Sequence, residues 1–184
     1  PAAALCAAAT MLLSVAVAGA DTRTVADPPN AQQADPVSVG HGHLARQRGI
    51  LFHRIATRQA WVAGALGNVT LSIWVNRPAR GRPDRTIVAE LNEVETLPFP
   101  PTSWMGVIRD KRGRVLGHAN AWQSSLRSFR IEFAKRLLGA RVRYYRWAMV
   151  VTSGCESVSP PPALCGPPRQ DRVPDRGSVI HRRP

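Results

Sequence analysis

Residues 69–75, VTLSIWV, decide the fold class of this chain. The odd-numbered positions are all apolar, whereas the even-numbered positions hold threonine, serine and Trp74. Successive side chains of a β-strand point to opposite faces, so this alternation predicts a strand with one face on a core. Trp74 is the exception, because it is a large aromatic residue on the face that the pattern assigns to solvent.

The same period of two recurs through the chain. Short runs of this kind, separated by turn signals such as the Asp110–Gly113 turn, predict an all-β, antiparallel β-sandwich with a jelly-roll-like order and roughly seven to nine strands. We expect a single domain over 37–181, with a hairpin between 37–44 and 50–57. We predict that the following side chains share one core: Val69, Leu71, Ile73, Val75, Phe129, Ile131, Phe133, Tyr145, Trp147 and Met149.

Three segments are less regular. Residues 21–36 contain several prolines and no apolar period, so we expect a disordered leader there. Residues 44–66 also place apolar side chains near helical spacing, which leaves a helix as the alternative, and 58–66 stay open between helix and strand. The tail after Cys165 is expected to add at most an edge strand near 178–181.

The first twenty residues predict export. Residues 2–20 are uncharged, rich in alanine and too short for a comfortable membrane span. They end in Ala18-Gly19-Ala20, a small-x-small pattern that signal peptidase accepts. We therefore expect cleavage after Ala20, a secreted protein without a transmembrane segment, and a basic segment of the signal lying before Pro1.

Export also guides the interpretation of the cysteines. Cys6 leaves with the signal, which makes Cys155 and Cys165 an even pair in an oxidising compartment. We expect a disulfide between them. The nine residues that separate them fit neither the spacing of a redox CxxC motif nor that of a zinc knuckle.

The charge is unusual. Lysine and arginine number 25 against 12 acidic residues, for a formal net charge of +13, and almost all of the positive charge is arginine. One explanation is a polyanionic partner and the other is the codon bias of a high-GC genome. Nucleic-acid-binding motifs are missing from the sequence, so nucleic acid is not the expected partner. The expected partner is a polysaccharide or an anionic cell-surface polymer.

A resemblance follows from the order of segments HGHL, ILFHRIAT, VTLSIWVN, RPDRTIVAEL, VIRDKRGRVLGHANAW, FRIEF, LLGARVRYYRWAMVV and DRVPDRG. It is similar to exported, mostly uncharacterised β proteins of high-GC bacteria, whose strand order looks like that of DOMON and family-9 carbohydrate-binding-module sandwiches. This resemblance implies a domain that binds a small ligand or sugar without catalysis. The loop at 76–85 has one carboxylate among four arginines, so no calcium site or other cofactor is carried over.

Four residues are candidates for ligand binding: Trp74, Trp122, His118 and Asn120. Trp74 and Trp122 lie on polar strand faces, where an exposed ring can stack on a sugar while His118 and Asn120 bond its hydroxyl groups. The alternative is that other segments cover these faces.

Catalysis is the second hypothesis. His41 and His43 share a strand face and His53 could lie across the hairpin, which would suit a metal-dependent enzyme or an extracellular hydrolase. We expect these histidines instead to be exposed or to hold single hydrogen bonds. The sequence contains no nucleophile elbow, and we expect no catalytic residue.

Overall fold

The structure, a computed structural model, describes residues 23–26, 36–44, 47–60, 66–92, 103–153 and 169–182. These residues form β-strands and one short 3-10 helix. The elements are β1 (Arg23–Ala26), β2 (Pro36–Leu44), β3 (Gln47–Thr57), β4 (Leu66–Val75), β5 (Arg85–Asn92), β6 (Ser103–Asp110), β7 (Val115–Ser125), β8 (Ser128–Ala134), η2 (Lys135–Leu138), β9 (Tyr144–Ser153), β10 (Arg169–Val173) and β11 (Val179–Arg182). The expected signal peptide and the expected Cys155–Cys165 disulfide lie outside the described residues.

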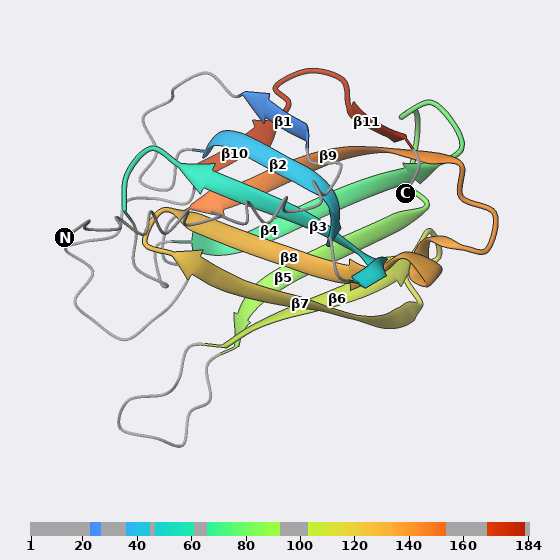
Figure 1. Ribbon diagram of the computed structural model, residues 1–184, viewed down its shortest axis with the longest axis horizontal. Helices are drawn as coiled ribbons and strands as arrows, with labels where there is room; N and C mark the ends of the chain where they lie inside the picture. The colour runs from blue at the N-terminus through green and yellow to red at the C-terminus, as the bar shows by residue number, and fades with distance from the viewer. Residues whose placement is uncertain are drawn as a thin grey trace, which may run out of the picture.

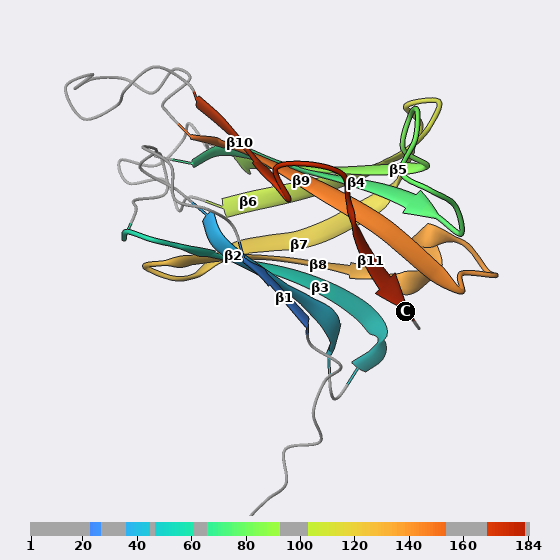
Figure 2. The same ribbon diagram turned by 90° about the horizontal axis from the view of Figure 1, so that it is seen from above.

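The strands form one antiparallel sheet in the order β1-β2-β3-β8-β7-β6-β5-β4-β9-β10, with β11 also paired to β9 (Figure 1). The sheet curves until β1, β2 and β3 face β4, β9 and β10 across the interior (Figure 2). The result is a nearly closed barrel. The all-β antiparallel class is confirmed, and the 11 strands exceed the expected number. The described strands belong to one continuous sheet, so the two separate sheets of a sandwich are not seen among them.

The seam of the barrel lies between its first and last strands. β10 pairs with one half of β9, from Arg169 opposite Ser153 to Val173 opposite Met149. β11 pairs with the other half of the same edge of β9. Together β10 and β11 act as one interrupted strand, and both lie close to β2.

The interior confirms the predicted strand phase. Nine of the ten predicted core side chains are buried, and the tenth, Val75, is half-buried and packs against them. Trp147 is fully buried, whereas its neighbour Arg146 is only partly covered, so the register of β9 is as expected. Because successive side chains of a strand alternate between the two faces of the sheet, knowing the face of one residue gives the face of every other residue in that strand.

Each of the three less regular segments of the sequence contributes to the sheet. Arg23–Ala26, within the expected disordered leader, forms β1 and pairs with β2. An edge strand is held by hydrogen bonds between backbone groups, so it can form without an alternating pattern of apolar residues. The helical alternative for 44–66 is wrong over Gln47–Thr57, which is β3. Residues 61–65 lie outside the described residues. The predicted edge strand near 178–181 is confirmed by β11, but the tail contributes more than this one strand, because Arg169–Val173 forms β10.

The β6–β7 turn and the short helix η2 lie at one end of the barrel. The β6–β7 turn closes with the amide of Gly113 donating to the carbonyl of Asp110, and Gly113 has a φ of 86°, which suits glycine. The short helix η2 packs at this end, where Leu138 is buried in the core. In the part of the chain that the structure describes, no helix has the length and apolar character needed to cross a membrane.

Candidate functional site

The outward face of β7 carries three of the four predicted ligand-binding residues. His118, Asn120 and Trp122 alternate with Ala119 and Ala121, which are buried in the core. The three larger side chains therefore point out of the barrel, and Trp122 keeps 37% of its surface exposed. The prediction that Trp122 is exposed beside His118 and Asn120 is confirmed.

Trp74 does not share this surface. Only 8% of it is exposed, and its indole Nε1 donates a hydrogen bond to the carbonyl of Gly81 at 3.1 Å. β4 and β7 are separated by β5 and β6 in the sheet. The expectation that Trp74 is an exposed ring is wrong, because the loop that follows β4 folds back over it.

A small hollow lies beside His118 and Asn120 on the outside of β3, β8 and β7. It has a volume of about 190 Å³ and also contains the side chains of Gln47 and Glu132. Asn120 and Glu132 are direct neighbours across the β7–β8 pair. Amide, imidazole and carboxylate groups therefore converge on one depression. Gln47 and Glu132 were not among the predicted binding residues, because the pattern of one strand does not show which strand lies beside it.

Arg130 connects this hollow to the tryptophan. Its guanidinium carbon lies 4.6 Å from the ring centre of Phe52 and 5.8 Å from that of Trp122. Its Nε is 2.7 Å from Oε1 of Glu132. A cation held between two rings and a carboxylate has little freedom to turn, so it restrains the Trp122 ring, while part of that residue stays exposed.

Two further apolar side chains flank the same face. Met105 on β6 lies opposite Asn120 and is 47% exposed, and Leu116 on β7 is 37% exposed. Exposed apolar groups interleaved with hydrogen-bonding groups form an amphipathic surface. We call the row Leu116, His118, Asn120 and Trp122 the β7 track.

A larger depression lies at the end of the β7 track, between the β4–β5 loop, the β6–β7 turn and η2. Figure 2 shows this loop and this turn together at one end of the sheet. The depression, which we call the basic cleft, has a volume of about 570 Å³. Its charged lining consists of the cations Arg77, Arg85, Lys111, Arg112 and Arg114 and the carboxylates Asp84 and Asp110. Leu116 also lines it, so the cleft and the β7 track share a residue.

Both carboxylates of the cleft already have partners. Asp84 accepts two hydrogen bonds from Arg77, at 2.8 and 3.1 Å, and one from the amide of Val75. Desolvation raises the pKa of Asp84, but the bonds from Arg77 and Val75 outweigh it and hold that pKa below its ordinary value. This bidentate pair fixes the shape of the β4–β5 loop.

Asp110 organises the turn in the same way. It accepts hydrogen bonds from the amides of Arg112 and Arg114 and from the guanidinium of Arg114. Desolvation again raises its pKa, and the bonds from Arg114 and Arg112 lower it below the ordinary value. The turn is therefore a rigid scaffold, and it presents Lys111 and Arg112 as exposed side chains.

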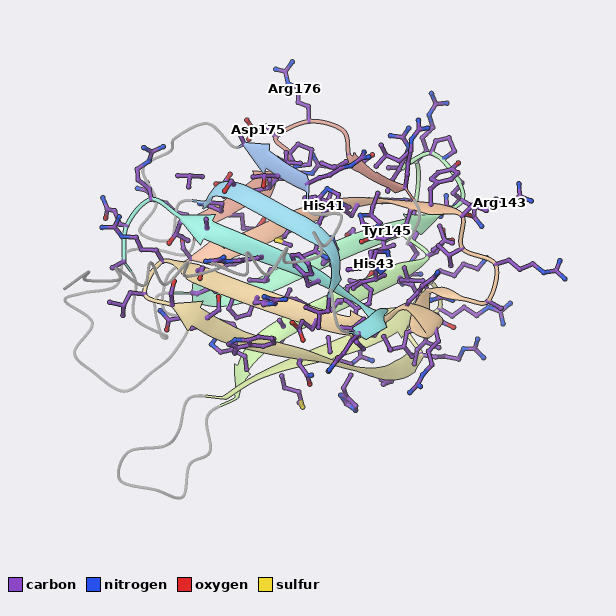
Figure 3. The ribbon with its side chains drawn as sticks, in the orientation of Figure 1. His41, His43, Arg143, Tyr145, Asp175 and Arg176 are labelled. Atoms are coloured by element: carbon purple, nitrogen blue, oxygen red, sulfur yellow. The ribbon has the colours of Figure 1, made fainter. Side chains whose placement is uncertain are left out.

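The histidines form a second cluster, inside the barrel. His41 on β2 and His53 on β3 are direct neighbours across the hairpin, and both are fully buried. His181 on β11 joins them from the other side of the seam, with its Nδ1 2.8 Å from Nδ1 of His41. Figure 3 labels His41, His43 and Tyr145 over the interior of the barrel, in contrast to Arg143 and Arg176, which extend away from it. The expectation of exposed or singly bonded histidines is wrong for His53, which is buried and, within the described residues, holds no hydrogen bond at either nitrogen, whereas His41 is buried and holds the bond to His181.

Aromatic rings surround this cluster. The ring centre of Trp147 lies 5.2 Å from that of His41 and 5.0 Å from that of His53, with nearly perpendicular rings. Tyr145 stacks on His181 at 4.8 Å. In the described part of the chain, neither nitrogen of His53 has a hydrogen-bond partner, and neither has the Tyr145 hydroxyl or the Trp147 indole nitrogen.

Burial controls the charge of these groups. Desolvation lowers the pKa of His53 well below 6.5, and the neighbouring His41 and His181 lower it further. Desolvation raises the pKa of Tyr145. The side chains of His53 and Tyr145 are therefore neutral near pH 7.

The catalytic hypothesis assigned reactive roles to His41, His43 and His53. A catalytic side chain must reach its substrate, and two of these three are enclosed by the barrel wall. Among the described residues, no three histidine, cysteine or acidic side chains are spaced to hold a metal ion.

The fold and the two surface sites together define an antiparallel β-barrel with an amphipathic track and a basic cleft on its outside. No known protein family matches this chain, and no curated protein or solved structure matches it.

Proposed function

We propose that this protein is an exported, non-catalytic binding domain whose ligand is a polysaccharide or another polymer of the cell envelope, bound along the β7 track. The observation that carries the proposal is the placement of Trp122 on one strand face with His118 and Asn120. The face of an indole ring offers an apolar surface to the C–H groups of a sugar. Side chains beside the ring can then bond the hydroxyl groups.

The chemistry around Trp122 supports this ligand class. A sugar ring has an apolar face and a polar rim, and the track has the complementary arrangement. Glu132 and Asn120 provide acceptors, and Gln47 and Asn120 provide amide donors, around the same hollow. Because Arg130 restrains the Trp122 ring, little conformational entropy is lost when a ligand packs on its exposed part.

The extended shape of the site supports a polymer over a single small molecule. Strand residues advance by about 3.3 Å, so Leu116 and Trp122 are separated by about 20 Å along β7. A surface of this length accommodates several sugar units. An open outer face without enclosing walls suits a chain that passes over it, whereas small ligands favour enclosed pockets.

Trp122→Ala tests the proposal. The full chain is screened against a panel of soluble polysaccharides, and the affinity for the best of them is measured by calorimetry. We expect Trp122→Ala to weaken binding about tenfold, because a buried ring–ligand contact is worth about 1–2 kcal/mol. Trp122→Phe should retain most of the affinity, since it keeps an aromatic face.

Leu126→Ala is the matched control. Leu126 is 72% exposed in the turn after β7, so its truncation also removes exposed apolar surface, but outside the track. Equal loss in Trp122→Ala and Leu126→Ala, with both variants folded, contradicts the proposal. Binding that survives in Trp122→Ala at full strength contradicts it as well.

Two measurements on the same sample test the other parts of the proposal. Mass spectrometry of protein recovered from the medium should give an N-terminus at Asp21. Metal analysis tests the second hypothesis, because a stoichiometric transition metal whose binding is lost in His41→Ala and His53→Ala would assign the interior histidines a chemical role.

A further inference from the structure

The basic cleft lies where a polymer on the β7 track would continue. Leu116 lines the cleft, and His118, two residues further along the same strand, lines the hollow beside the track. A chain that follows the outward face of β7 away from Trp122 therefore reaches the β6–β7 turn. The charge of the cleft therefore indicates which charged groups a bound polymer would carry.

The cleft has an excess of positive charge that its own carboxylates do not neutralise. It contains five cationic side chains and two carboxylates. Asp84 is paired with Arg77 and Asp110 with Arg114. Arg85 donates to the backbone carbonyls of Leu137 and Asp84, which hold its guanidinium in place, and it also acts electrostatically on the Asp84 carboxylate, so this single negative charge faces two cations, Arg77 and Arg85.

Lys111 and Arg112 supply the rest of the excess positive charge in the basic cleft. Both are exposed on the rigid turn that Asp110 organises, and within the described residues neither side chain forms an ion pair or a hydrogen bond. A guanidinium group suits a carboxylate or sulfate, because its planar fork bonds two oxygens at once. An ammonium group beside it adds a mobile point charge.

We infer that the basic cleft is an acid-recognition subsite of the β7 track, so the polymer bound by this protein is an anionic polysaccharide whose carboxylate or sulfate groups contact Lys111 and Arg112. This inference rests on the proposed function and adds to it the chemical class of the ligand. Net charge by itself does not explain the site, because this excess occurs in a hollow of defined shape that continues into the track.

The experiment compares two polymers with the same sugar backbone, one with free carboxylates and one with uncharged methyl esters. Polygalacturonate carries one carboxylate on each sugar, and its methyl ester of the same chain length carries none. Affinities of the full chain for both are measured at low and physiological salt. We expect the acid form to bind about tenfold more tightly than the ester, and this preference to shrink as salt is added.

Two double variants separate the cleft from overall charge. Lys111→Gln/Arg112→Gln removes two positive charges from the cleft. Arg127→Gln/Arg176→Gln removes two from exposed positions elsewhere, in the β7–β8 turn and the β10–β11 loop. The first should abolish the preference for the acid form and leave affinity for the ester unchanged. The second should change either affinity less than twofold.

Each remaining outcome overturns the inference in a recognisable way. Equal losses in both double variants mean that net charge attracts the polymer without a subsite. Equal affinity for acid and ester, lost together in Trp122→Ala, leaves the proposed function intact and refutes the acid-recognition subsite. Failure of both polymers, and of the wider panel, refutes the proposed function itself. Tighter binding of a single-stranded oligonucleotide that depends on Lys111 and Arg112 assigns the cleft to nucleic acid.

Discussion

Nδ1 of His41 and Nδ1 of His181 are 2.8 Å apart although the two residues are separated by 140 positions in the chain. The contact crosses the seam of the barrel, between β2 and β11. A hydrogen bond between two imidazole nitrogens needs one proton on one of them, so the pair is stable when at least one ring is neutral. Two cationic rings at this distance would repel each other.

The first prediction concerns acid. The pKa of His53 in the folded protein lies below 6.5, so the unfolded chain binds more protons than the folded one as the pH falls through that value. The contribution to stability is complete above this pH and is lost progressively below it. We expect urea unfolding to give a clearly lower free energy of unfolding at about pH 5 than at about pH 7.5.

His53→Leu is the control for this acid effect. Leucine has a similar volume and no titratable group, and it leaves no buried nitrogen without a partner. The variant should lose less stability between the two pH values than the wild type does. An unchanged pH dependence in His53→Leu would show that other groups cause the acid effect.

The second prediction concerns the seam. A double-mutant cycle with His41→Ala and His181→Ala should give a coupling energy of about 1 kcal/mol, the usual net value of one buried hydrogen bond. The same cycle with His41→Ala and His118→Ala should give none, because His118 lies on the outside of β7. Coupling near zero for the first pair would contradict a bond across the seam.

The third prediction concerns the approach of β6 to β7. A Cβ atom at Gly106 would lie 2.8 Å from Cβ and 2.9 Å from the carbonyl oxygen of Ala119. These atoms belong to the sheet backbone or adjoin it, so they cannot move aside cheaply. Gly106→Ala should lower the free energy of unfolding by about 1–3 kcal/mol. Gly49→Ala in β3 meets nothing within 4 Å and should change it by less than about 1 kcal/mol. Similar effects of the two substitutions on thermal unfolding would refute this explanation.

The fourth prediction concerns the scaffold of the basic cleft. Asp84→Asn removes the negative charge that Arg77 binds, and it should destabilise the protein by at most about 1 kcal/mol, since the pair is partly exposed. Its main effect should be greater protease sensitivity of the β4–β5 loop, measured by limited proteolysis. Asp175→Asn removes the same charge from an exposed position in the β10–β11 loop and should have neither effect.

The fifth prediction concerns the cysteines. Exported protein should contain a bond between Cys155 and Cys165, because both thiols would be in an oxidising compartment. Peptide mapping of the unreduced protein should recover the two cysteines in one linked fragment. Free thiols at both positions in protein taken from the medium would contradict this expectation.

Strand phase was predictable from the sequence because it is a local property. The alternation at 69–75, and the similar alternation around Phe129 and Trp147, assigned each side chain to the correct side of the barrel wall. The exposure of Trp122 followed from the same rule, since Ala119 and Ala121 on the opposite phase of β7 face the core. The turn at Asp110–Gly113 was predictable for the same reason, because the contacts of its aspartate and the backbone conformation of its glycine involve only five consecutive residues.

The tertiary structure decided what no local pattern contains. Trp74 has the correct phase for exposure, yet a loop that returns over it buries the ring. His181 joins His41 and His53, and Glu132 joins Asn120, only because particular strands become neighbours. The curvature that turns one sheet into a nearly closed barrel depends on the pairing of all the strands. A strand's sequence determines which side of a sheet each residue takes, whereas its neighbours depend on pairing with strands far away in the chain, which the pattern of one strand does not contain.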